Sequence, residues 1–337
     1  MASYADAGVN LDNSNHAKRL IAAAVTSTHG PAVLAGMGAF GGAFDLGSAA
    51  RQATHPVLVA STDGVGTKTL IARATSRFDT VGQDLVNHCV NDILVQGARP
   101  LFFLDYIASA RLDPLEVAAI VGGVAEACRA AGCALLGGET AEMPDVYHAD
   151  AFDLAGTMIG VVDRDRLIDG RMIAPGDIVL GLRSNGLHTN GYSLARRICD
   201  PLGYDRRPPE LGGASLGEAL LAVHCSYLPH LETLWNAGVM VKGMAHITGG
   251  GLLENLPRTL PPGNGATIHR GSWPVPPLLQ LLVARAELDD AEAYRVFNMG
   301  VGMVLVVDAE SVEQVRALLP DSDTIGEIVA GDGVQLV

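Results

Sequence analysis

The stretch PVLVASTDGVGTK, residues 56–68, joins an apolar run to a glycine-rich loop and decides the fold class. Residues 56–61 are typical of a buried strand, and residues 63–68 of a loop that opens a helix. Proteins built from alternating strands and helices bind ligands at the carboxyl ends of their strands, which is where Asp63 falls. The Gly-x-x-x-x-Gly-Lys spacing of a P-loop is absent. A turn with a helix-capping Asp63 is the structural alternative to a ligand loop.

The same alternation continues on both sides of this stretch. Apolar runs predict strands at residues 100–106, 133–136 and 152–162, with helices over residues 84–96 and 114–131. Further strands are expected at residues 177–182 and 301–307. The polar, turn-rich residues 163–175 mark a candidate boundary between domains spanning residues 1–168 and 169–337. Strands alternating with helices favour α/β or α+β layering.

Composition narrows the functional class. The 337 residues are 48% hydrophobic and 18% charged, which excludes a disordered chain. The net charge of −14 disfavours broad nucleic-acid binding but permits a nucleotide held through cations and backbone N–H groups. Five cysteines without a C-x-x-C pair indicate a reducing cytosol and neither a zinc nor a disulfide framework. Because no signal peptide or membrane-length apolar run is visible, a cytoplasmic enzyme or ligand binder is expected.

A second glycine-rich string, GMGAFGG at residues 36–42, satisfies the pattern G-x-G-x-x-G. A dinucleotide-binding fold would place this string between a strand and a long helix, and residues 43–51 make a poor helix. Three interpretations stay open: a dinucleotide fingerprint, a loop that covers phosphates, and a plain turn. A phosphate-covering loop is favoured.

Acidic residues recur after the predicted strands. Asp84, His88 and Asp92 are spaced at i, i+4 and i+8, so they form one stripe on a helix. A solvated polar face is the alternative, and it is the favoured one for His88. Asp63, Asp92 and Glu139 would repel one another unless divalent cations lay between them. They therefore predict a Mg²⁺–nucleotide site, with an exposed acidic turn as the alternative for Glu139.

The second half carries two polar loops. NGLHTNGY, residues 185–192, offers an imidazole, a hydroxyl and amides, and His188 has the ordinary pKa range for acid–base work. A structural histidine in a turn is the alternative. ITGGGL, residues 247–252, begins a helix with backbone N–H groups available to an anion, so a sugar phosphate would fit there.

Taken together, these strings resemble one family, the phosphoribosylformylglycinamidine cyclo-ligases, or AIR synthetases. The matching strings, in chain order, are TDGVGTK (62–68), CVNDILVQG (89–97), PLFFLDY (100–106), GGETAEMP (137–144), GLHTNGYS (186–193), AHITGGG (245–251) and YRVFNMG (294–300), preceded by Ser3-Tyr4 and DAGV (6–9). GETAEM and HITGGG are specific to the family, whereas DGVGTK also suits its wider superfamily.

The resemblance implies an N-terminal α/β half and a C-terminal α+β half, in a homodimer whose N-terminal sheets pair into a barrel. It also implies ATP-dependent ring closure of formylglycinamidine ribonucleotide, with Mg²⁺ and, as a further candidate, K⁺. ATP would phosphorylate the formyl oxygen, and the amidine nitrogen would then attack that carbon. No nucleic acid or membrane partner is expected.

The resemblance and the residue chemistry together give the candidate site residues. The catalytic candidates are Asp63, Lys68, Asp92 and His188, and the metal ligands are Asp63, Asp92 and Glu139. The candidates for ATP contacts are Gly36, Gly38, Gly41, Gly42, Gly64, Gly66, Thr67, Lys68, Asn91 and Glu139. The candidates for substrate contacts are His188, Thr189, Asn190, Thr248, Gly249, Gly250, Gly251 and Asn298.

The sequence also departs from the family pattern near its start. Ala5 stands where the family has Lys, Asn10 where it has Asp, and His29-Gly30-Pro31 where it has Arg-Arg-Pro. These changes remove positive charge from a segment expected to close over ATP. Two alternatives therefore stay open: a sister Mg–ATP enzyme, such as a thiamine-monophosphate kinase or a hydrogenase-maturation protein, and a non-catalytic nucleotide-binding paralogue.

Overall fold

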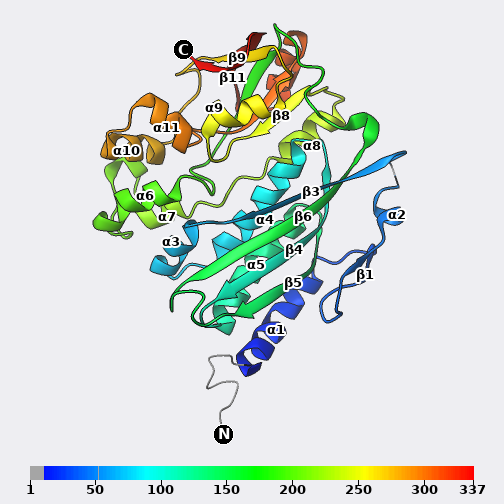
Figure 1. Cartoon of the computed structure of the whole chain (residues 1–337), viewed down its shortest axis with the longest axis vertical. Helices are drawn as coiled ribbons and strands as arrows, with labels where there is room; N and C mark the ends of the chain where they lie inside the picture. Colours follow the sequence, from blue (N-terminus) through cyan, green and yellow to red (C-terminus); the bar gives the residue numbers. More distant parts are fainter. Residues whose placement is uncertain (1–10, 52) are drawn as a thin grey trace. The chain divides into compact units, whose positions relative to one another are not determined.

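The computed structural model describes residues 11–51 and 53–337 (Figure 1). The chain divides into two compact units. Unit 1 comprises the residues up to 93 together with 98–165, and unit 2 comprises residues 94–97 and 166–337. Ala5 and Asn10, two of the departures from the family pattern, lie outside the described residues. Among the described residues, no helix combines the length and the apolar character that crossing a membrane requires.

Unit 1 is built on a four-stranded sheet. Its helices are α1 (Leu11–Thr26), α2 (Leu46–Ala49), α3 (Lys68–Thr75), α4 (Asp79–Leu94) and α5 (Pro114–Ala130), and its strands are β1 (Val33–Ala35), β2 (Ala43–Phe44), β3 (Pro56–Gly64), β4 (Arg99–Ser109), β5 (Ala134–Glu142) and β6 (Phe152–Asp163). The sheet order is β3-β6-β4-β5, with β4 and β5 parallel and the other pairs antiparallel. β1 and β2 form a separate antiparallel pair.

The two faces of this sheet differ. Helices α4 and α5 cover one face, on which Phe103 and Met158 are fully buried (Figure 1). Side chains alternate between faces along a strand, so the neighbouring residues point the other way. On that second face Leu58, Leu104 and Tyr106 are exposed. The sheet therefore has one packed face and one open apolar face.

Glycines let α4 and α5 approach closely. A Cβ added at Gly82 of α4 would lie 2.1 Å from the carbonyl oxygen of Ile120, and one at Gly123 of α5 would lie 2.1 Å from that of Asp79. α5 begins with Asp113 as its cap, whose carboxylate accepts from the backbone N–H groups of Leu115 and Glu116. Local capping and close packing thus fix the helical layer on which the acidic stripe depends.

Unit 2 is built on a six-stranded sheet. Its helices are α6 (Tyr192–Cys199), α7 (Leu216–Leu220), α8 (Leu228–Asn236), α9 (Gly251–Asn255), α10 (Pro277–Ala286), α11 (Asp290–Val296) and α12 (Val312–Leu318), and its strands are β7 (Ile178–Arg183), β8 (Gly243–His246), β9 (Asn264–Ile268), β10 (Val301–Val307), β11 (Ser322–Ala330) and β12 (Gly333–Leu336). The sheet order is β12-β9-β11-β7-β10-β8, and only the β12–β9 pair is parallel.

The register of β10 gathers three loops at one edge of this sheet. β10 runs antiparallel to both β7 and β8, and all of its residues are buried. Arg183 at the end of β7 pairs with Val301, and His246 at the end of β8 pairs with Met303. The loops that follow β7 and β8 therefore begin beside the loop that precedes β10.

The mixed α/β architecture predicted from the sequence is confirmed, with two local differences and one alternative excluded. β3 extends through Asp63 and Gly64 because these residues pair with β6, so Asp63 lies on a strand rather than in a loop. β5 extends through Glu142 because it pairs with β4, so Glu139 also lies on a strand. The G-x-G-x-x-G string connects β1 to β2, which contradicts the strand-to-helix position of a dinucleotide fingerprint.

Candidate functional site

On the acidic stripe of α4, His88 and Asp92 contact strand β3, and His88 is buried rather than solvated. Asp63 Oδ2 lies 2.8 Å from His88 Nε2, and His88 Nε2 lies 3.8 Å from Asp92 Oδ2. The hydroxyl of Ser61 donates to Asp92 Oδ2 at 2.8 Å. The side chain of His88 is only 3% exposed, whereas that of Asp63 is 47% exposed. The expectation of a solvated His88 was therefore wrong, because β3 covers this face of the helix.

Asp63 and His88 stabilise each other's ionised forms. Burial alone would raise the pKa of Asp63, but the hydrogen bond and the charge of His88 outweigh burial and hold that pKa below its usual value. Burial alone would lower the pKa of His88, but its bond to Asp63 and the charges of Asp92, Asp63 and Asp84 raise it. An ionised Asp63 with a partly exposed carboxylate results.

Lys68 does not reach solvent. Its ammonium lies 2.8 Å from Asp84 Oδ2, and both side chains are fully buried. Burial lowers the pKa of Lys68, while the charge of Asp84 and the hydrogen bond to it oppose that change. Lys68 therefore anchors the start of α3 to α4 in this structure, and its ammonium is not directed at a phosphate as the sequence predicted.

Glu139 cannot share a metal ion with Asp63 of the same chain. Gly64, beside Asp63, pairs with Ala155, which pairs with Tyr106, which in turn pairs with Glu139. Paired residues point to one face, so Glu139 lies on the open face and Asp63 on the helix-covered face. The two residues also lie on opposite edge strands, three strand spacings or about 14 Å apart. The predicted three-carboxylate site of a single chain is thus reduced to Asp63 and Asp92.

The remaining ATP candidates of unit 1 differ in exposure. Gly64 and Gly66 flank the buried Val65 at the end of β3, and Gly66 has φ +64°, a conformation that favours glycine. Thr67 caps α3 without a side-chain hydrogen bond from its hydroxyl to the helix. Asn91 is fully buried on α4. Backbone atoms at the end of β3 are therefore more accessible than the Asn91 amide.

The loop of residues 36–42 is packed at its ends and open in its middle. A Cβ at Gly36 would lie 2.5 Å from the ring of His29, and one at Gly42 would lie 2.4 Å from the side chain of Leu136. Gly38 and Gly41 have open space around them. The His29 ring itself bonds to the Leu135 carbonyl oxygen. This arrangement fits a loop held at both ends with a free backbone between them.

In unit 2, Asn298 joins the loop that precedes β10 to the loop that follows β7. Its Oδ1 accepts from Ser184 Oγ and from the backbone N–H of Gly300, each at 3.0 Å. Its Nδ2 donates to the carbonyl oxygen of Gly186 at 2.8 Å. The side chain is 4% exposed, so these bonds occupy it within the fold. Asn298, predicted to contact substrate, uses its side-chain amide to join these two loops.

The loop after β7 presents Thr189 and Asn190 beside the loop after β8. The backbone N–H of Gly249 donates to Asn190 Oδ1 at 3.1 Å. The Nδ2 of Asn190 is buried and has no hydrogen-bond partner among the described residues. His188, 1% exposed, has φ +62°, which is uncommon outside glycine. The Asn190 amide therefore has a donor free to bond to a ligand or a water molecule.

The Thr248–Gly251 loop is less open to an anion than its sequence predicted. The N–H of Gly251 donates to the carbonyl oxygen of Thr248, and that of Gly249 is used by Asn190. Asn255 Nδ2 donates to the carbonyl oxygens of residues 248, 249 and 251. Of the three glycine N–H groups, two are therefore engaged within the protein. α9 is only five residues long, so its N-terminus carries little dipole.

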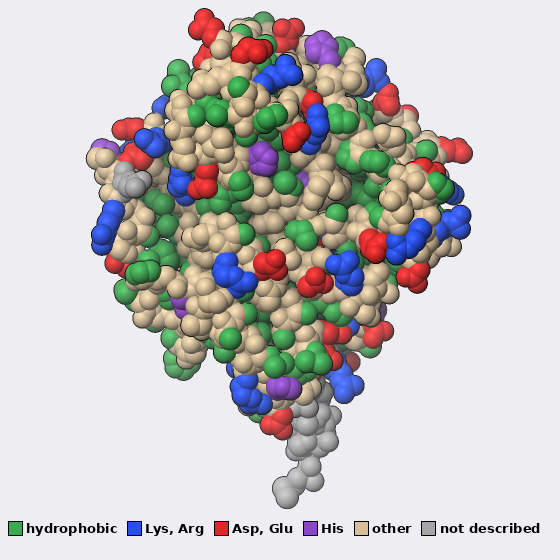
Figure 2. All heavy atoms as spheres, turned by 180° about the vertical axis from the view of Figure 1, so that it is seen from behind, with side chains coloured by type: hydrophobic (Ala, Val, Ile, Leu, Met, Phe, Trp, Pro, Cys, Tyr) green, Lys and Arg blue, Asp and Glu red, His purple; other side chains and the backbone are tan. Residues whose placement is uncertain are grey.

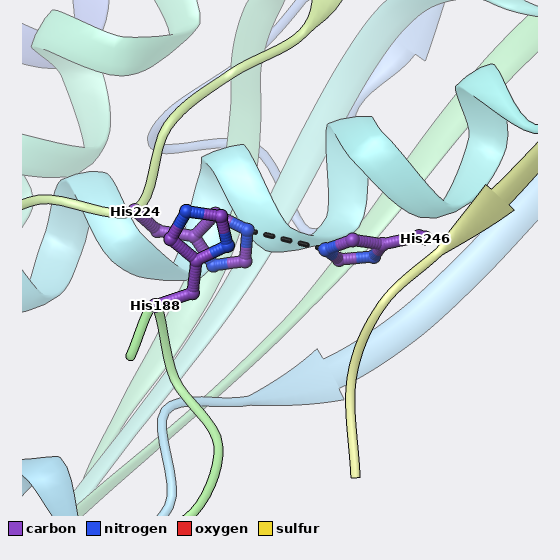
Figure 3. A group of neighbouring side chains, drawn as sticks. All are labelled: His188, His224 and His246. Carbon is purple, nitrogen blue, oxygen red and sulfur yellow. Dashed lines mark hydrogen bonds between the residues drawn. The ribbon is translucent and has the colours of Figure 1, made fainter. Parts of the chain in front are cut away.

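Sequence reasoning missed two histidines that contact this region. His224 and His246 lie beside His188 in one buried cluster (Figure 3). His224 comes from the irregular segment between α7 and α8, and His246 ends β8. No local spacing links residues 188, 224 and 246, so only the fold brings them together. His246 did stand in one of the family strings, but nothing in its neighbourhood marked it as part of a cluster.

Figure 2 shows the face of the molecule that lies behind the view of Figure 1. Basic and acidic side chains are interspersed over the described residues of that face, without a continuous basic stripe. A stripe of that kind is the usual electrostatic footprint of nucleic-acid binding.

Comparisons with known proteins agree with the motifs. The sequence profile of the AIR synthase related protein family matches in both parts, its N-terminal domain over residues 46–162 and its C-terminal domain over residues 174–337. A phosphoribosylformylglycinamidine cyclo-ligase of Desulfitobacterium hafniense is 50% identical over 317 residues, covering 94% of this chain and 92% of that one. A protein of the same name from Geobacillus thermodenitrificans is 48% identical, covering 98% and 97%.

Two solved structures share the fold at low identity. The E. coli hydrogenase maturation protein HypE has a TM-score of 0.67 at 21% identity, covering 95% of this chain and 93% of that one. Thiamine-monophosphate kinase from Stenotrophomonas maltophilia K279a has a TM-score of 0.68 at 18% identity, covering 94% of each. At such identities the likeness concerns the fold alone. The near-50% identity over almost the whole length shows that the chain belongs to the phosphoribosylformylglycinamidine cyclo-ligase family.

Proposed function

We propose that this chain converts formylglycinamidine ribonucleotide and ATP to 5-aminoimidazole ribonucleotide, ADP and phosphate, a ring closure of de novo purine synthesis. The observation that carries the proposal is the near-50% identity, over almost the full length, to proteins named for this reaction. The sister enzymes match at only 18–21% identity, which disfavours their reactions.

The reaction requires that the γ-phosphoryl group of ATP and the formyl group of the substrate be held close together and that water be excluded. Transfer of the γ-phosphoryl group to the formyl oxygen makes that oxygen a leaving group, and ADP departs. The amidine nitrogen then attacks the formyl carbon, the C–O bond breaks, phosphate leaves and one proton is lost. Positioning and charge stabilisation dominate phosphoryl transfer, so few side chains need to form covalent bonds.

Unit 1 is proposed to hold the nucleotide. The donor set of Asp63 and Asp92 suits Mg²⁺, because both are carboxylates, both are partly exposed and His88 keeps Asp63 ionised. When bound, Mg²⁺ would neutralise charge on the phosphate oxygens. The open middle of the loop of residues 36–42 and the backbone at Gly64–Thr67 are proposed to cover the phosphates. The buried Lys68 and Asn91 are proposed to have structural roles in α3 and α4 rather than to contact the nucleotide. K⁺ stays a prediction.

Unit 2 is proposed to hold the formylglycinamidine ribonucleotide. The buried Asn190 Nδ2 is a donor aimed at an acceptor on the substrate. His188, Thr189 and Thr248 line the same converging loops, and the N–H of Gly250 is the remaining donor of the glycine run. Asn298 acts through these loops as a positioning residue.

A homodimer is proposed to form through the open face of the unit 1 sheet. Leu58 is 55% exposed there, and Leu104 and Tyr106 are each 37% exposed. An apolar cavity of about 290 Å³ on this face is lined by Phe44, Leu58, Phe102, Leu104 and Leu136 among others. Contiguous apolar surface of this kind marks an interaction site. Glu139 lies on the same face, so any contact it makes with a nucleotide is proposed to occur beside that interface.

The cysteines accord with a cytoplasmic setting. Cys89, Cys128, Cys133, Cys199 and Cys225 are all free thiols. Four of the five are buried, and free thiols are what a reducing compartment maintains. We therefore propose a cytoplasmic location.

The decisive experiment incubates purified protein with Mg–ATP and formylglycinamidine ribonucleotide and follows 5-aminoimidazole ribonucleotide and ADP together. We expect both products in equal amounts, each dependent on the substrate. ADP without the imidazole would indicate a sister kinase activity and would contradict the proposal. Neither product, with nucleotide binding retained in calorimetry, would indicate a non-catalytic paralogue. Light scattering of the same sample tests the dimer.

A further inference from the structure

Three histidines of unit 2 form a buried cluster that the proposed reaction does not explain. His188 is 1% exposed, His224 is not exposed and His246 is 6% exposed. One nitrogen from each ring can be chosen so that all three lie within 4.8 Å of one another. The ring nitrogens of His224 and His246 point at each other in Figure 3.

The spacing of His224 and His246 matches that of two ligands on one ion. Their Nε2 atoms are 3.2 Å apart. Two nitrogens on a tetrahedral zinc ion, each about 2.0–2.1 Å from the metal, lie about 3.3 Å from one another. In this structure a single proton lies between the two ring nitrogens. A metal ion could take the position of that proton with little change in the separation of the two nitrogens.

The surroundings of His224 favour its Nε2 atom as a ligand. The hydroxyl of Thr189 lies 3.4 Å from His224 Nδ1. An oxygen on the far nitrogen fixes the tautomer of a metal-binding histidine and orients its ring. The outer partner that such a site requires is therefore already in place, on the residue next to His188.

Strand β10 leaves room for the cluster because residue 302 is glycine. A Cβ at Gly302 would lie 2.5 Å from Cε1 of His188 and 2.0 Å from the hydroxyl oxygen of Tyr227. Tyr227 in turn donates to the carbonyl oxygen of Arg183 at 2.9 Å. Tyr227, held to the end of β7, thus forms a fixed wall beside the ring of His188.

We propose that His188, His224 and His246 form a binding site for one divalent transition-metal ion of the Zn²⁺ and Co²⁺ class. Three neutral imidazoles with a fourth position open is the ligand set of several such sites, and imidazole suits these ions better than it suits Mg²⁺. The three histidines all belong to unit 2, whereas the carboxylates assigned to Mg²⁺ belong to unit 1, and the proposal does not depend on the ring-closing reaction.

Binding requires His188 to move. Its ring now stacks on that of His224, with centroids 4.1 Å apart and planes 18° apart. Parallel rings cannot both direct a nitrogen at one ion, so the His188 ring must rotate out of the stack. Because His188 also belongs to the proposed substrate loop, an ion bound here would hold that side chain and compete with substrate.

The test is titration of the purified, metal-free protein with CoCl₂ in excess Mg²⁺, which occupies the carboxylate site. We expect one Co²⁺ per chain, with the strong visible absorption of a four- or five-coordinate ion. X-ray absorption of the Zn²⁺-loaded protein should show a nitrogen shell at about 2.0–2.1 Å and no sulfur at about 2.3 Å. That spectrum needs no variant, so it remains decisive even if substitutions in the cluster prevent folding.

Variants locate the ion. His224→Gln should weaken Co²⁺ binding by more than the roughly 10–100-fold that loss of an outer partner costs, and Thr189→Val by about that range. His230→Gln is the matched control, because His230 also packs beside Tyr227 but lies outside the cluster, and it should bind as the wild type does. Absence of stoichiometric binding, a sulfur or purely oxygen shell, or full binding by His224→Gln would overturn the proposal. None of these outcomes bears on turnover with Mg–ATP, which tests the proposed function alone.

Discussion

The two polar centres of the molecule are stabilised in different ways. In unit 1, ionised groups are paired beneath a sheet: Lys68 with Asp84, and His88 with Asp63. In unit 2, the hydrogen-bonded groups are neutral, and the Asn298 amide joins the loop that follows β7 to the loop that precedes β10. Ion pairs leave a large penalty when one partner is lost, whereas neutral bonds leave a smaller one. Substitutions at the unit 1 centre should therefore cost more, and its paired charges should make the stability of unit 1 depend on pH more than the neutral bonds of Asn298 do for unit 2.

The chain offers separate probes for the two units. Both tryptophans, Trp235 and Trp273, lie in unit 2, so fluorescence reports unit 2 alone. The indole of Trp273 donates to the carbonyl oxygen of Met299, next to Asn298. Hydrogen–deuterium exchange of peptides from α3, α4 and the β3–β6 pair reports unit 1. The units can thus be unfolded in one sample and followed independently.

Breaking the Lys68–Asp84 pair should have the largest effect. Lys68→Met leaves the carboxylate of Asp84 buried beside an apolar chain, so unit 1 should lose about 3–5 kcal/mol of unfolding free energy. Urea unfolding followed by exchange of unit 1 peptides measures this loss. Replacing both partners by apolar groups, as Lys68→Met with Asp84→Leu, should recover most of it. A single variant that loses less than about 1 kcal/mol would mean that the pair is not a buried anchor.

Asp63→Asn should come next, through activity rather than stability. The amide can still bond to His88 but offers no negative charge to a cation, so turnover with Mg–ATP should fall about 100–1000-fold, or about 3–4 kcal/mol. The kcat at saturating Mg²⁺ is the quantity to measure. Asp79→Asn is the matched control, since Asp79 starts α4, the helix that carries His88, with its side chain 60% exposed. Near-normal turnover of Asp63→Asn would remove Asp63 from the metal site.

In unit 2, Asn298→Ala should cost about 2–3 kcal/mol because it leaves Ser184, Gly186 and Gly300 without their amide partner. The fluorescence of Trp273 should report an earlier urea transition, with the exchange of unit 1 peptides unchanged. Asn185→Ala serves as comparison, because the exposed Asn185 makes one hydrogen bond, to the carbonyl oxygen of Val223, and its loss should be smaller. Equal losses from the two variants would show that Asn298 does not join the loops.

Strand and helix positions could be predicted because they depend on local patterns. The apolar runs that predicted β3, β4, β6, β7 and β10 are confirmed, and the predicted helix over residues 114–131 is α5. The predicted ends of two strands were wrong because pairing with a neighbouring strand extends them. Pairing with β6 places Asp63 in β3, and pairing with β4 places Glu139 in β5. Such pairing joins residues far apart in the chain, which a window of sequence does not contain.

The site was predictable as a set of residue types but not as a geometry. Acidic motifs singled out Asp63 and Asp92, and the structure places both carboxylates beside His88, while their role in metal binding stays a prediction. They did not reveal that Glu139 points to the other face of the sheet, because sheet order and register decide that. Likewise, the positive charge of Lys68 predicted a contact with a phosphate group. Its burial against Asp84 depends on how the start of α3 packs beside α4, which the sequence pattern does not reveal.

The smallest effect, and the sharpest test of the difference in pH response, concerns Asp105 of β4. Burial raises the pKa of this carboxyl to about 7 from an ordinary value of 3.8. Between about pH 4 and pH 7 the folded state therefore keeps a proton that the unfolded chain has released, so the stability of unit 1 falls as the pH rises through this window.

Below that window Asp105 is protonated in both the folded and the unfolded chain. Above it Asp105 is ionised in both, and the loss of unfolding free energy is complete. The upper limit is about 1.4 kcal/mol per pH unit, and partial contact with solvent should reduce the change from pH 5 to pH 7 to about 1–2 kcal/mol. Exchange of unit 1 peptides in urea at these two pH values measures it. In Asp105→Asn, which keeps the shape of the side chain beside Gly138 but cannot ionise, this part of the pH dependence should vanish, while the transition reported by Trp273 keeps its wild-type response. If Asp105→Asn and the wild type lose the same stability between pH 5 and pH 7, the carboxyl titrates normally and the pH response of unit 1 has another source.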